Sequence, residues 1–311
     1  MELRDLRTLI GIAESGSLSG AARKLNLTQP ALSASLKRLE DELKVQLVAR
    51  HSRGADVTEE GKFVLQKAYA ILHDVADMTT VAQDLIEEPI GDVRLGLPTT
   101  VAGGITAELV HRLCTRHPLV RLHVIEAMSG VLVEQLQLGR LDMAILFDIQ
   151  PMAGLRSEPI LIEEPRLLVS GSHELASRKQ IRLDELDQLE LVMPSQVHSI
   201  RGLIDRISKS EGVSLKIIAD VDSFPGIVSL VQKGYPTIFP TYLVREHIER
   251  GTIAAIPLVQ PRIDWTLHLA TRQDSVRPRA SLATARLLID LCSELVVNGI
   301  WPGRLHPRRA P

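Results

Sequence analysis

The segment Thr28–Leu43, with the sequence TQPALSASLKRLEDEL, has the pattern of an amphipathic helix. Thr28 is a residue type that caps helices, and Pro30 falls in the first turn, where a missing N–H is tolerated. Apolar side chains recur along the segment at steps of four, three and four residues, at Leu32, Leu36, Leu39 and Leu43. That spacing puts them on one stripe of a helix, which predicts that this stripe is buried.

Polar and basic side chains occupy a second stripe of the same segment. Gln29, Ser33 and Lys37 recur at steps of four residues. Side chains of these types can contact base edges and phosphates when a helix lies in the major groove of DNA. We therefore expect this stripe to face DNA.

Two more helices are predicted before this segment. Apolar residues at helical spacing indicate the first of them, at Leu3, Leu6, Leu9 and Ile10. Gly16 can end this helix, and Ser17 can cap a second one over Leu18–Leu25. Two helices joined by a tight turn, the second with a polar outer face, are typical of a helix-turn-helix.

Basic charge is concentrated near the N-terminus. The chain has 36 basic and 38 acidic side chains, and this net charge of −2 argues against a uniformly basic surface. Between residues 21 and 55, however, seven basic residues stand against three acidic ones, a local balance of +4. Arg50, His51, Arg53 and Gly54 follow in a segment that resembles a β-wing, an element that contacts the DNA backbone or the minor groove.

Residues 1–61 resemble the winged helix-turn-helix of LysR-type transcriptional regulators. The resemblance is carried, in order, by Gly16-Ser17-Leu18, Ala21-Ala22, Leu25, Thr28–Leu43, Leu47, Arg50 and Thr58–Gly61. Val48 stands where the family usually has Phe, and we interpret it as a smaller core residue. The resemblance implies DNA contacts at the helix caps, on the third helix and in the wing, at Ser17, Thr28, Gln29, Pro30, Ser33, Lys37, Arg38, Arg50 and Arg53.

At the level of architecture the resemblance covers the whole chain. It implies an all-α winged helix-turn-helix domain and an α/β effector domain of two Rossmann-like subdomains, similar to periplasmic-binding proteins. The implied partners are double-stranded DNA with an inverted-repeat operator, a small-molecule effector, further copies of the chain in a homodimer or homotetramer, and RNA polymerase. The segments 95–104 and Leu141–Asp148 are most similar to the branch with nitrogen-assimilation regulators, some of which need no effector.

Composition and periodicity divide the chain into four parts. Pro89 and Gly91 separate a helical first part from a second part in which short strands and helices alternate, which indicates a mostly parallel sheet. We expect a DNA-binding domain at 1–58, a connecting helix at 59–89, an effector domain at 90–303 and a mobile tail at 304–311. Within the effector domain, the first subdomain is expected at about 92–161 and 266–300, and the second at about 162–265.

The connecting helix is expected to pair with a second copy of the chain. After the cap Thr58, apolar residues follow a 3.5-residue spacing without a break, at Val64, Ala68, Ile71, Val75, Met78, Ala82 and Leu85. A helix of about 30 residues is a rod of roughly 45 Å, which has little to bury against in its own chain. We favour a dimer coiled coil; the alternative is an ordinary core helix.

Strand ends in the second part are candidate ligand-binding positions. The strand Asp92–Leu97 leads through a loop with Thr99 and Thr100 to a helix expected over Ile105–His117, and free N–H groups at such a helix start favour an anion. The same reasoning at other strand ends, with the cleft that the family resemblance implies, predicts effector contacts at Thr99, Thr100, Ser129, Phe147, His198 and Phe224.

No catalytic, metal or cofactor site is predicted. The chain has ten histidines but no HExxH, CxxC or G-x-S-x-G motif. Cys114 and Cys292 are expected to be buried, with a redox-sensing cysteine as the alternative. No signal peptide and no membrane span is predicted, so we expect a cytoplasmic protein. The alternatives to a regulator are a solute-binding protein and a cytosolic α/β enzyme that uses the cleft.

Overall fold

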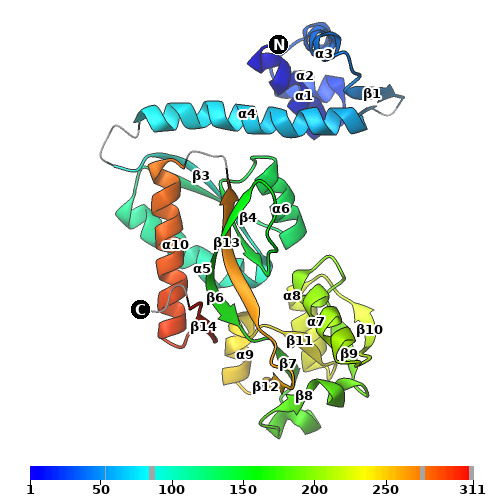
Figure 1. Cartoon of the computed structure of the whole chain (residues 1–311), viewed down its shortest axis with the longest axis vertical. Helices are drawn as coiled ribbons and strands as arrows, with labels where there is room; N and C mark the ends of the chain where they lie inside the picture. Colours follow the sequence, from blue (N-terminus) through cyan, green and yellow to red (C-terminus); the bar gives the residue numbers. More distant parts are fainter. Residues whose placement is uncertain (53, 84–87, 274–276, 308–311) are drawn as a thin grey trace.

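The computed structural model describes residues 1–52, 54–83, 88–273 and 277–307 (Figure 1). The N-terminal domain begins with three helices, α1 (Leu3–Ser15), α2 (Leu18–Lys24) and α3 (Gln29–Leu43). Their predicted boundaries are confirmed by the caps. Gly16 ends α1 in the left-handed conformation, with φ +60°. The Ser17 hydroxyl accepts the Gly20 N–H at 3.1 Å, and the Thr28 hydroxyl accepts the Ala31 N–H at 3.4 Å.

The predicted buried stripe of α3 is confirmed at three of its four positions. Leu32, Leu36 and Leu39 are buried in the core of the N-terminal domain, together with Val48, which acts as the core residue we expect. Leu43 is 37% exposed because α3 ends there and the chain turns away at Lys44, which has φ +55°.

A hairpin of β1 (Val48–His51) and β2 (Gly54–Val57) forms the wing, so the N-terminal domain contains a small antiparallel sheet besides its helices. The wing is tied to the turn between α1 and α2, because the Ala55 N–H donates a 2.9 Å hydrogen bond to the Gly16 carbonyl. Gly54 lies so close to this turn that a Cβ would be 2.4 Å from the Gly16 oxygen.

The helix α4 (Glu59–Gln83) follows the wing and lies between the N-terminal helices and the effector domain (Figure 1). The expectation that it has little to bury against in its own chain is wrong for its first half. Ala68 is fully buried in the N-terminal core, and Val64 packs against the same core, because α1 lies along this face of α4. Phe63, by contrast, is 72% exposed and Ile71 is also exposed. Leu85, the last residue of the predicted seam, lies outside the described residues.

The first half of the effector domain is built on a mixed sheet. Its strand order is β14 (Gly303–Leu305), β6 (Leu155–Glu163), β13 (Trp265–Arg272), β5 (Met143–Phe147), β3 (Gly91–Leu97) and β4 (Val120–Glu126). Strand β3 pairs in parallel with β4 and β5, whereas β13 runs antiparallel to β5 and β6. The helices of this half are α5 (Thr99–Arg116), α6 (Ser129–Gln137) and α10 (Arg279–Val297).

The second half has its own strands and lies farthest from the N-terminal domain (Figure 1). One sheet has the order β11 (Thr237–Phe239), β7 (Arg166–Ser170), β12 (Ile253–Val259) and β8 (Ile181–Arg182), and β10 (Lys216–Asp220) pairs in parallel with β9 (Glu190–Met193). The helices here are α7 (Ser199–Ser210), α8 (Phe224–Gln232) and α9 (Arg245–Glu249), with a 3-10 turn, η3, at Tyr242–Val244. Strands β6 and β13 connect the halves. They keep residues 162–163 and 265 in the first sheet, whereas the sequence analysis places these residues in the second subdomain.

Two other expectations need correction. The predicted tail at 304–311 is not free from its start, because Arg304 and Leu305 belong to β14, which pairs with β6. Trp301, just before it, is buried and donates a hydrogen bond from Nε1 to Glu163. Residues 308–311 lie outside the described residues. Helix α5 begins at Thr99 rather than Ile105, so the expected loop is the first part of this helix.

None of the described helices is long and apolar enough to span a membrane.

Candidate functional site

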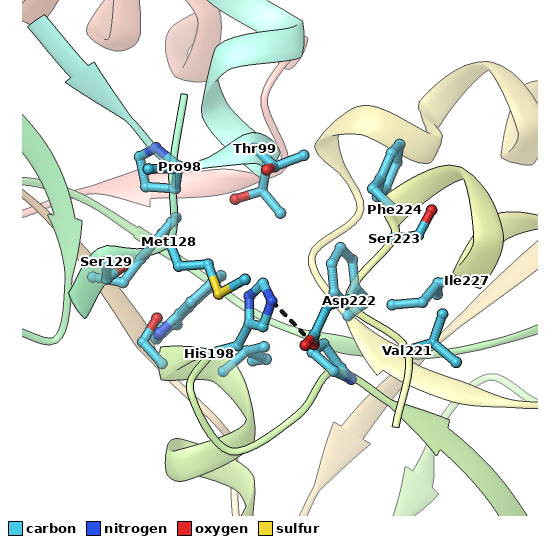
Figure 2. A pocket seen from close by; sticks show the side chains of 18 residues that line it. Pro98, Thr99, Met128, Ser129, His198, Val221, Asp222, Ser223, Phe224 and Ile227 are labelled. Atoms are coloured by element: carbon cyan, nitrogen blue, oxygen red, sulfur yellow. Dashed lines mark ion pairs between the residues drawn. The ribbon is translucent and has the colours of Figure 1, made fainter. Parts of the chain in front are cut away.

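A cavity of about 50 Å³ lies between the two halves of the effector domain (Figure 2). The structure brings all six predicted effector residues together on its wall, Thr99, Thr100, Ser129, Phe147, His198 and Phe224. The first four come from the half with the six-stranded sheet and the last two from the other half. A ligand in this cavity would therefore touch both halves.

Four helices begin at the cavity. Thr99 and Ser129 are the first residues of α5 and α6, and Ser199 and Phe224 are the first residues of α7 and α8. The first N–H groups of a helix have no partner within the helix, and the helix dipole adds partial positive charge there. The cavity is therefore suited to an anionic group, although none of its described lining residues is a lysine or an arginine.

Polar side chains on the cavity wall divide into paired and unpaired groups. Thr99 Oγ1 donates a 2.7 Å hydrogen bond to Glu126. Thr100 Oγ1 is buried and has no hydrogen-bond partner in the described part of the chain. A buried hydroxyl without a partner is costly, so Thr100 is available to a ligand.

On the opposite wall, His198 Nε2 lies 3.3 Å from Asp222 Oδ1, the pair marked in Figure 2. Asp222 is fixed from the other side, because it accepts hydrogen bonds of 2.8 Å from both the N–H and the hydroxyl of Ser195. These two bonds, with the nearby His198, lower the pKa of Asp222. The second half of the domain thus presents a fixed carboxylate to the cavity, so an anionic group is favoured on the opposite wall, at the starts of α5 and α6.

Aromatic rings form the apolar part of the wall. Phe147, at the end of β5, stacks on Trp265, at the start of β13, with ring centroids 3.5 Å apart and planes 7° apart. Phe224 and Phe239 stack in the other half, with centroids 5.9 Å apart. The cavity therefore combines apolar faces with helix N-termini, as small-molecule sites commonly do.

Among the lining residues that sequence reasoning missed are Asp222, Phe239 and Trp265. Asp222 lies two residues before the predicted Phe224, and Trp265 is the last residue of the predicted second subdomain, where the chain returns to the first half. The end of β10 and the predicted subdomain boundary at 265–266 were the signals that could have identified Asp222 and Trp265. Phe239, at the end of the short strand β11, gave no comparable signal.

The predicted DNA-facing side chains of α3 lie at the surface. Thr28, Gln29, Pro30 and Lys37 are exposed, and Ser33 is partly exposed between them. Three other residues were predicted to contact DNA. The Ser17 hydroxyl accepts a hydrogen bond as the cap of α2, Arg50 is exposed on β1, and Arg53 lies outside the described residues.

Arg38, predicted to contact DNA, is exposed but pairs with a buried carboxylate of the N-terminal domain. Its guanidinium donates a 2.8 Å hydrogen bond to the carboxylate of Asp5, which is 2% exposed. Ser35 and the Glu2 N–H also donate to Asp5, at 2.6 and 2.9 Å. Burial alone raises the pKa of Asp5, but these hydrogen bonds and the charge of Arg38 outweigh it and leave the pKa lowered. Arg38 therefore joins α3 to α1.

The cysteines differ in environment. Cys292 is buried in α10, and burial raises the pKa of its thiol to about 12, so the reactive thiolate is scarce near neutral pH. Cys114 is exposed on α5, which corrects the expectation that it is buried: Leu109 and Leu113 form the buried stripe of that helix, and Cys114 points away from it. Within the described residues, no three His, Cys, Asp or Glu side chains are grouped as metal ligands.

Comparison with known families agrees with this architecture. Residues 3–62 match the family described as "Bacterial regulatory helix-turn-helix protein, lysR family", and residues 87–295 match "LysR substrate binding domain". The chain therefore belongs to the LysR family of DNA-binding transcriptional regulators. This membership places it among transcriptional regulators rather than enzymes.

Individual relatives are similar over most of their length. The nitrogen assimilation regulatory protein Nac of Klebsiella aerogenes is 29% identical over 297 residues, which are 94% of this chain and 96% of that protein. The transcriptional dual regulator OxyR of Escherichia coli K12 is 27% identical over 282 residues, 88% of this chain and 90% of that protein.

Among solved structures, a full-length OxyR variant from Pseudomonas aeruginosa has the same fold, with a TM-score of 0.74 at 24% identity, and the match covers 93% of this chain and 97% of that one. Full-length CbnR in complex with its target DNA matches with a TM-score of 0.65 at 21% identity, over 92% of this chain and 98% of that one.

Proposed function

We propose that this regulator binds an inverted-repeat operator as a dimer, through α3 in the major groove and the wing beside it, and that a small organic anion in the effector cavity changes this binding. The observation that carries the proposal is the convergence of four helix N-termini and an unpaired Thr100 hydroxyl on one cavity. We place the protein in the cytoplasm, where its DNA would be.

The outer face of α3 supports the DNA-binding part. Gln29 and Lys37 are exposed on a helix whose opposite face is buried, so this face can enter a groove without loss of the core. CbnR, which shares this fold, has been solved in complex with its target DNA. A bidentate contact of glutamine to adenine and a contact of lysine to phosphate are the expected modes.

Exposed apolar residues on α4 support the dimer. Phe63 and Ile71 lie on one side of the helix, two steps of four residues apart, and both are exposed in the single chain. A second α4 packed on this side would bury them, and it would set the distance between two copies of α3 to match two operator half-sites. Tetramer formation and contact with RNA polymerase belong to the same proposal, as the family membership suggests.

The size of the cavity bears on how an effector would act. About 50 Å³ holds only a few water molecules, whereas ligand pockets commonly have volumes of about 300–1,000 Å³. An organic anion therefore requires the two halves to move apart at β6 and β13. Such a change in the angle between the halves is the step through which binding would alter the rest of the molecule.

Binding to DNA duplexes selected from a random pool tests the DNA-binding part. Gln29→Ala should change the difference in binding free energy between selected sites by about 1–3 kcal/mol. Lys37→Ala should lower the affinity for all sites by a similar factor, and it should reduce the slope of the logarithm of affinity against the logarithm of salt concentration by about one. Lys209→Ala, at an exposed lysine on α7, is the matched control and should leave binding unchanged. Unchanged binding by both α3 variants would refute the assignment of α3 to the groove.

A further inference from the structure

Tyr69 in α4 contacts both the effector domain and the helix-turn-helix. The guanidinium carbon of Arg140 lies 3.8 Å from the centroid of the Tyr69 ring, a cation–π contact. The Tyr69 hydroxyl donates a 2.9 Å hydrogen bond to Glu14 in α1, and Lys24 in α2 donates a 2.8 Å hydrogen bond to the same carboxylate. These contacts form a continuous path from the effector domain to both helices that precede α3.

The protonation states of this path are fixed near neutral pH. Burial and the Glu14 carboxylate raise the pKa of Tyr69 to about 12, so its hydroxyl remains a hydrogen-bond donor. Burial also raises the pKa of Glu14, but the hydrogen bonds from Lys24 and Tyr69 outweigh it and leave that pKa lowered. Glu14 is therefore a carboxylate that can accept both bonds.

The effector-domain end of the path is held weakly. Arg140 Nε is buried and has no hydrogen-bond partner among the residues that the structure describes, and the guanidinium lies over the Tyr69 ring. A cavity of about 280 Å³ separates Gln66 and Lys67 of α4 from Gln137 of the effector domain beside this contact. A loosely filled interface of this kind can open at a small cost in free energy.

Helix α6 connects this contact to the effector cavity. Its first residue, Ser129, lines the cavity, and Leu132 and Leu136 are buried against the sheet. At its other end the Arg140 N–H donates a 2.8 Å hydrogen bond to the Gln135 carbonyl, so the backbone of Arg140 is fixed to the last turn. The nine residues of α6 form a rod of about 13 Å with the ligand position at one end and Arg140 at the other.

We infer that Arg140, Tyr69 and Glu14 form a latch that holds the helix-turn-helix against the effector domain, and that occupation of the cavity at Ser129 moves α6 and releases this latch. The inference rests on the proposed function, since it states how the cavity is coupled to DNA binding. The coupling needs two arrangements of one packed element, latched and released, and a ligand that favours one of them.

The distance between the helix-turn-helix and the effector domain tests the latch without DNA or effector. Spin labels on Ser19→Cys in α2 and on the native Cys114 in α5 can report this distance, since both sites are exposed and Cys292 is buried. Labelled chains diluted with excess unlabelled protein give the distance within one chain. We expect one narrow distance distribution in the otherwise unaltered protein.

Latch variants should lose the narrow distribution. Arg140→Met removes the cation, and the milder Tyr69→Phe keeps the ring but removes the hydroxyl that bonds to Glu14. We expect both to give a broader and longer distribution, and the double variant to resemble the stronger single variant because the contacts act in series. Arg121→Met, at an exposed arginine on β4, is the control and should keep the narrow distribution. An unchanged distribution in Arg140→Met overturns the latch.

A bulky side chain in the cavity tests the connection through α6. Ser129→Phe adds a ring to the wall of a cavity of about 50 Å³, and we expect it to displace the start of α6. It should then broaden the distribution as Arg140→Met does, and it should cause no further broadening when combined with Arg140→Met. Glu134→Phe, on the exposed side of α6, is the matched control. A narrow distribution in Ser129→Phe overturns this connection. Failure of the proposed function would instead show as absent DNA binding by the unaltered protein, whatever the distances are.

Discussion

Tyr242, from the second half of the effector domain, donates a 2.9 Å hydrogen bond to the carbonyl of Gly104 in α5 of the first half. The ring lies so close to the helix that a Cβ on Gly104 would be 2.1 Å from Tyr242 Cε1. The Trp301 ring stacks on the Tyr242 ring, with ring centroids 4.3 Å apart, so a shift of Tyr242 would disturb this stacking. Glycine at 104 thus allows the two halves to meet.

Gly104→Ala should therefore lower the free energy of unfolding by about 1–3 kcal/mol, the usual range for an overpacked site. Gly202→Ala is a suitable control because this glycine is also within a helix, and an added Cβ would have an Arg206 side-chain nitrogen at 3.8 Å as its nearest neighbour. The free energy of unfolding of this control should rise by about 0.5–1 kcal/mol, because alanine has less backbone entropy than glycine in the unfolded chain. Urea unfolding of both variants measures the difference, and equal effects would contradict the close packing of Tyr242.

Replacing Trp265 should affect both stability and ligand response. Trp265→Ala removes the stacking partner of Phe147 and should cost about 3–5 kcal/mol, whereas Trp265→Phe should cost less because it keeps an aromatic ring. The chain has two tryptophans, Trp265 at the cavity and Trp301 away from it. In a screen of small carboxylates, a binder should change the fluorescence of the native protein more than that of Trp265→Phe, which keeps only Trp301. An equal response of the two proteins would place the ligand elsewhere.

Glu163 should make the effector domain less stable at higher pH. Burial raises its pKa from 4.5 to about 8, partly offset by the hydrogen bond from Trp301. The folded state therefore holds a proton that the unfolded state releases, so the free energy of unfolding falls as pH rises from 4.5 to about 8. The slope is on the order of 1 kcal/mol per pH unit.

Glu163→Gln should flatten this dependence, because glutamine does not titrate. Unfolding in urea at several pH values between 5 and 8 measures both proteins. The variant should be as stable as the native protein at the acid end and more stable at the alkaline end. Parallel profiles would show that Glu163 does not carry the proton.

Arg38 and Lys37 are adjacent, but replacing Arg38 should lower stability, whereas replacing Lys37 should lower the affinity for DNA. Arg38→Met leaves the buried Asp5 carboxylate without its cation and should cost about 1–3 kcal/mol of stability. The cost should shrink at acid pH, since the pKa of Asp5 is lowered and its stabilising contribution is lost as the carboxylate is protonated. Lys37→Met should leave the thermal midpoint unchanged and weaken DNA binding. Thermal unfolding combined with gel-shift titration separates the two effects.

The N-terminal helices could be predicted closely because their ends depend on local residues. Gly16, Ser17 and Thr28 stop or cap a helix through groups within three or four positions, so sequence alone locates them. The start of α5 could not be found in this way. Gly103 and Gly104 suggest a loop, yet both lie inside the helix, where the lack of a Cβ lets Leu243 and Tyr242 approach the helix backbone. These two partners lie about 140 residues further along the chain.

The effector cavity was predictable to the extent that strand ends converge in this type of sheet. All six predicted residues line it, because each lies at the carboxyl end of a strand or at the start of a helix. Contacts between distant side chains were not predictable. Asp5 with Arg38, and Arg140 with Tyr69, are pairs whose partners are fixed by tertiary packing and leave no periodic signal.

The hydrogen bond from Ala55 to Gly16 has a consequence for how operators can vary. The bond fixes the wing to the turn that precedes α2, and α1 and α2 both pack on α3, so we expect the distance between the wing and α3 to stay constant. In the proposed complex, a half-site would therefore not tolerate an inserted or deleted base pair between the positions that α3 and the wing touch. Operators of different length would then differ only between their half-sites.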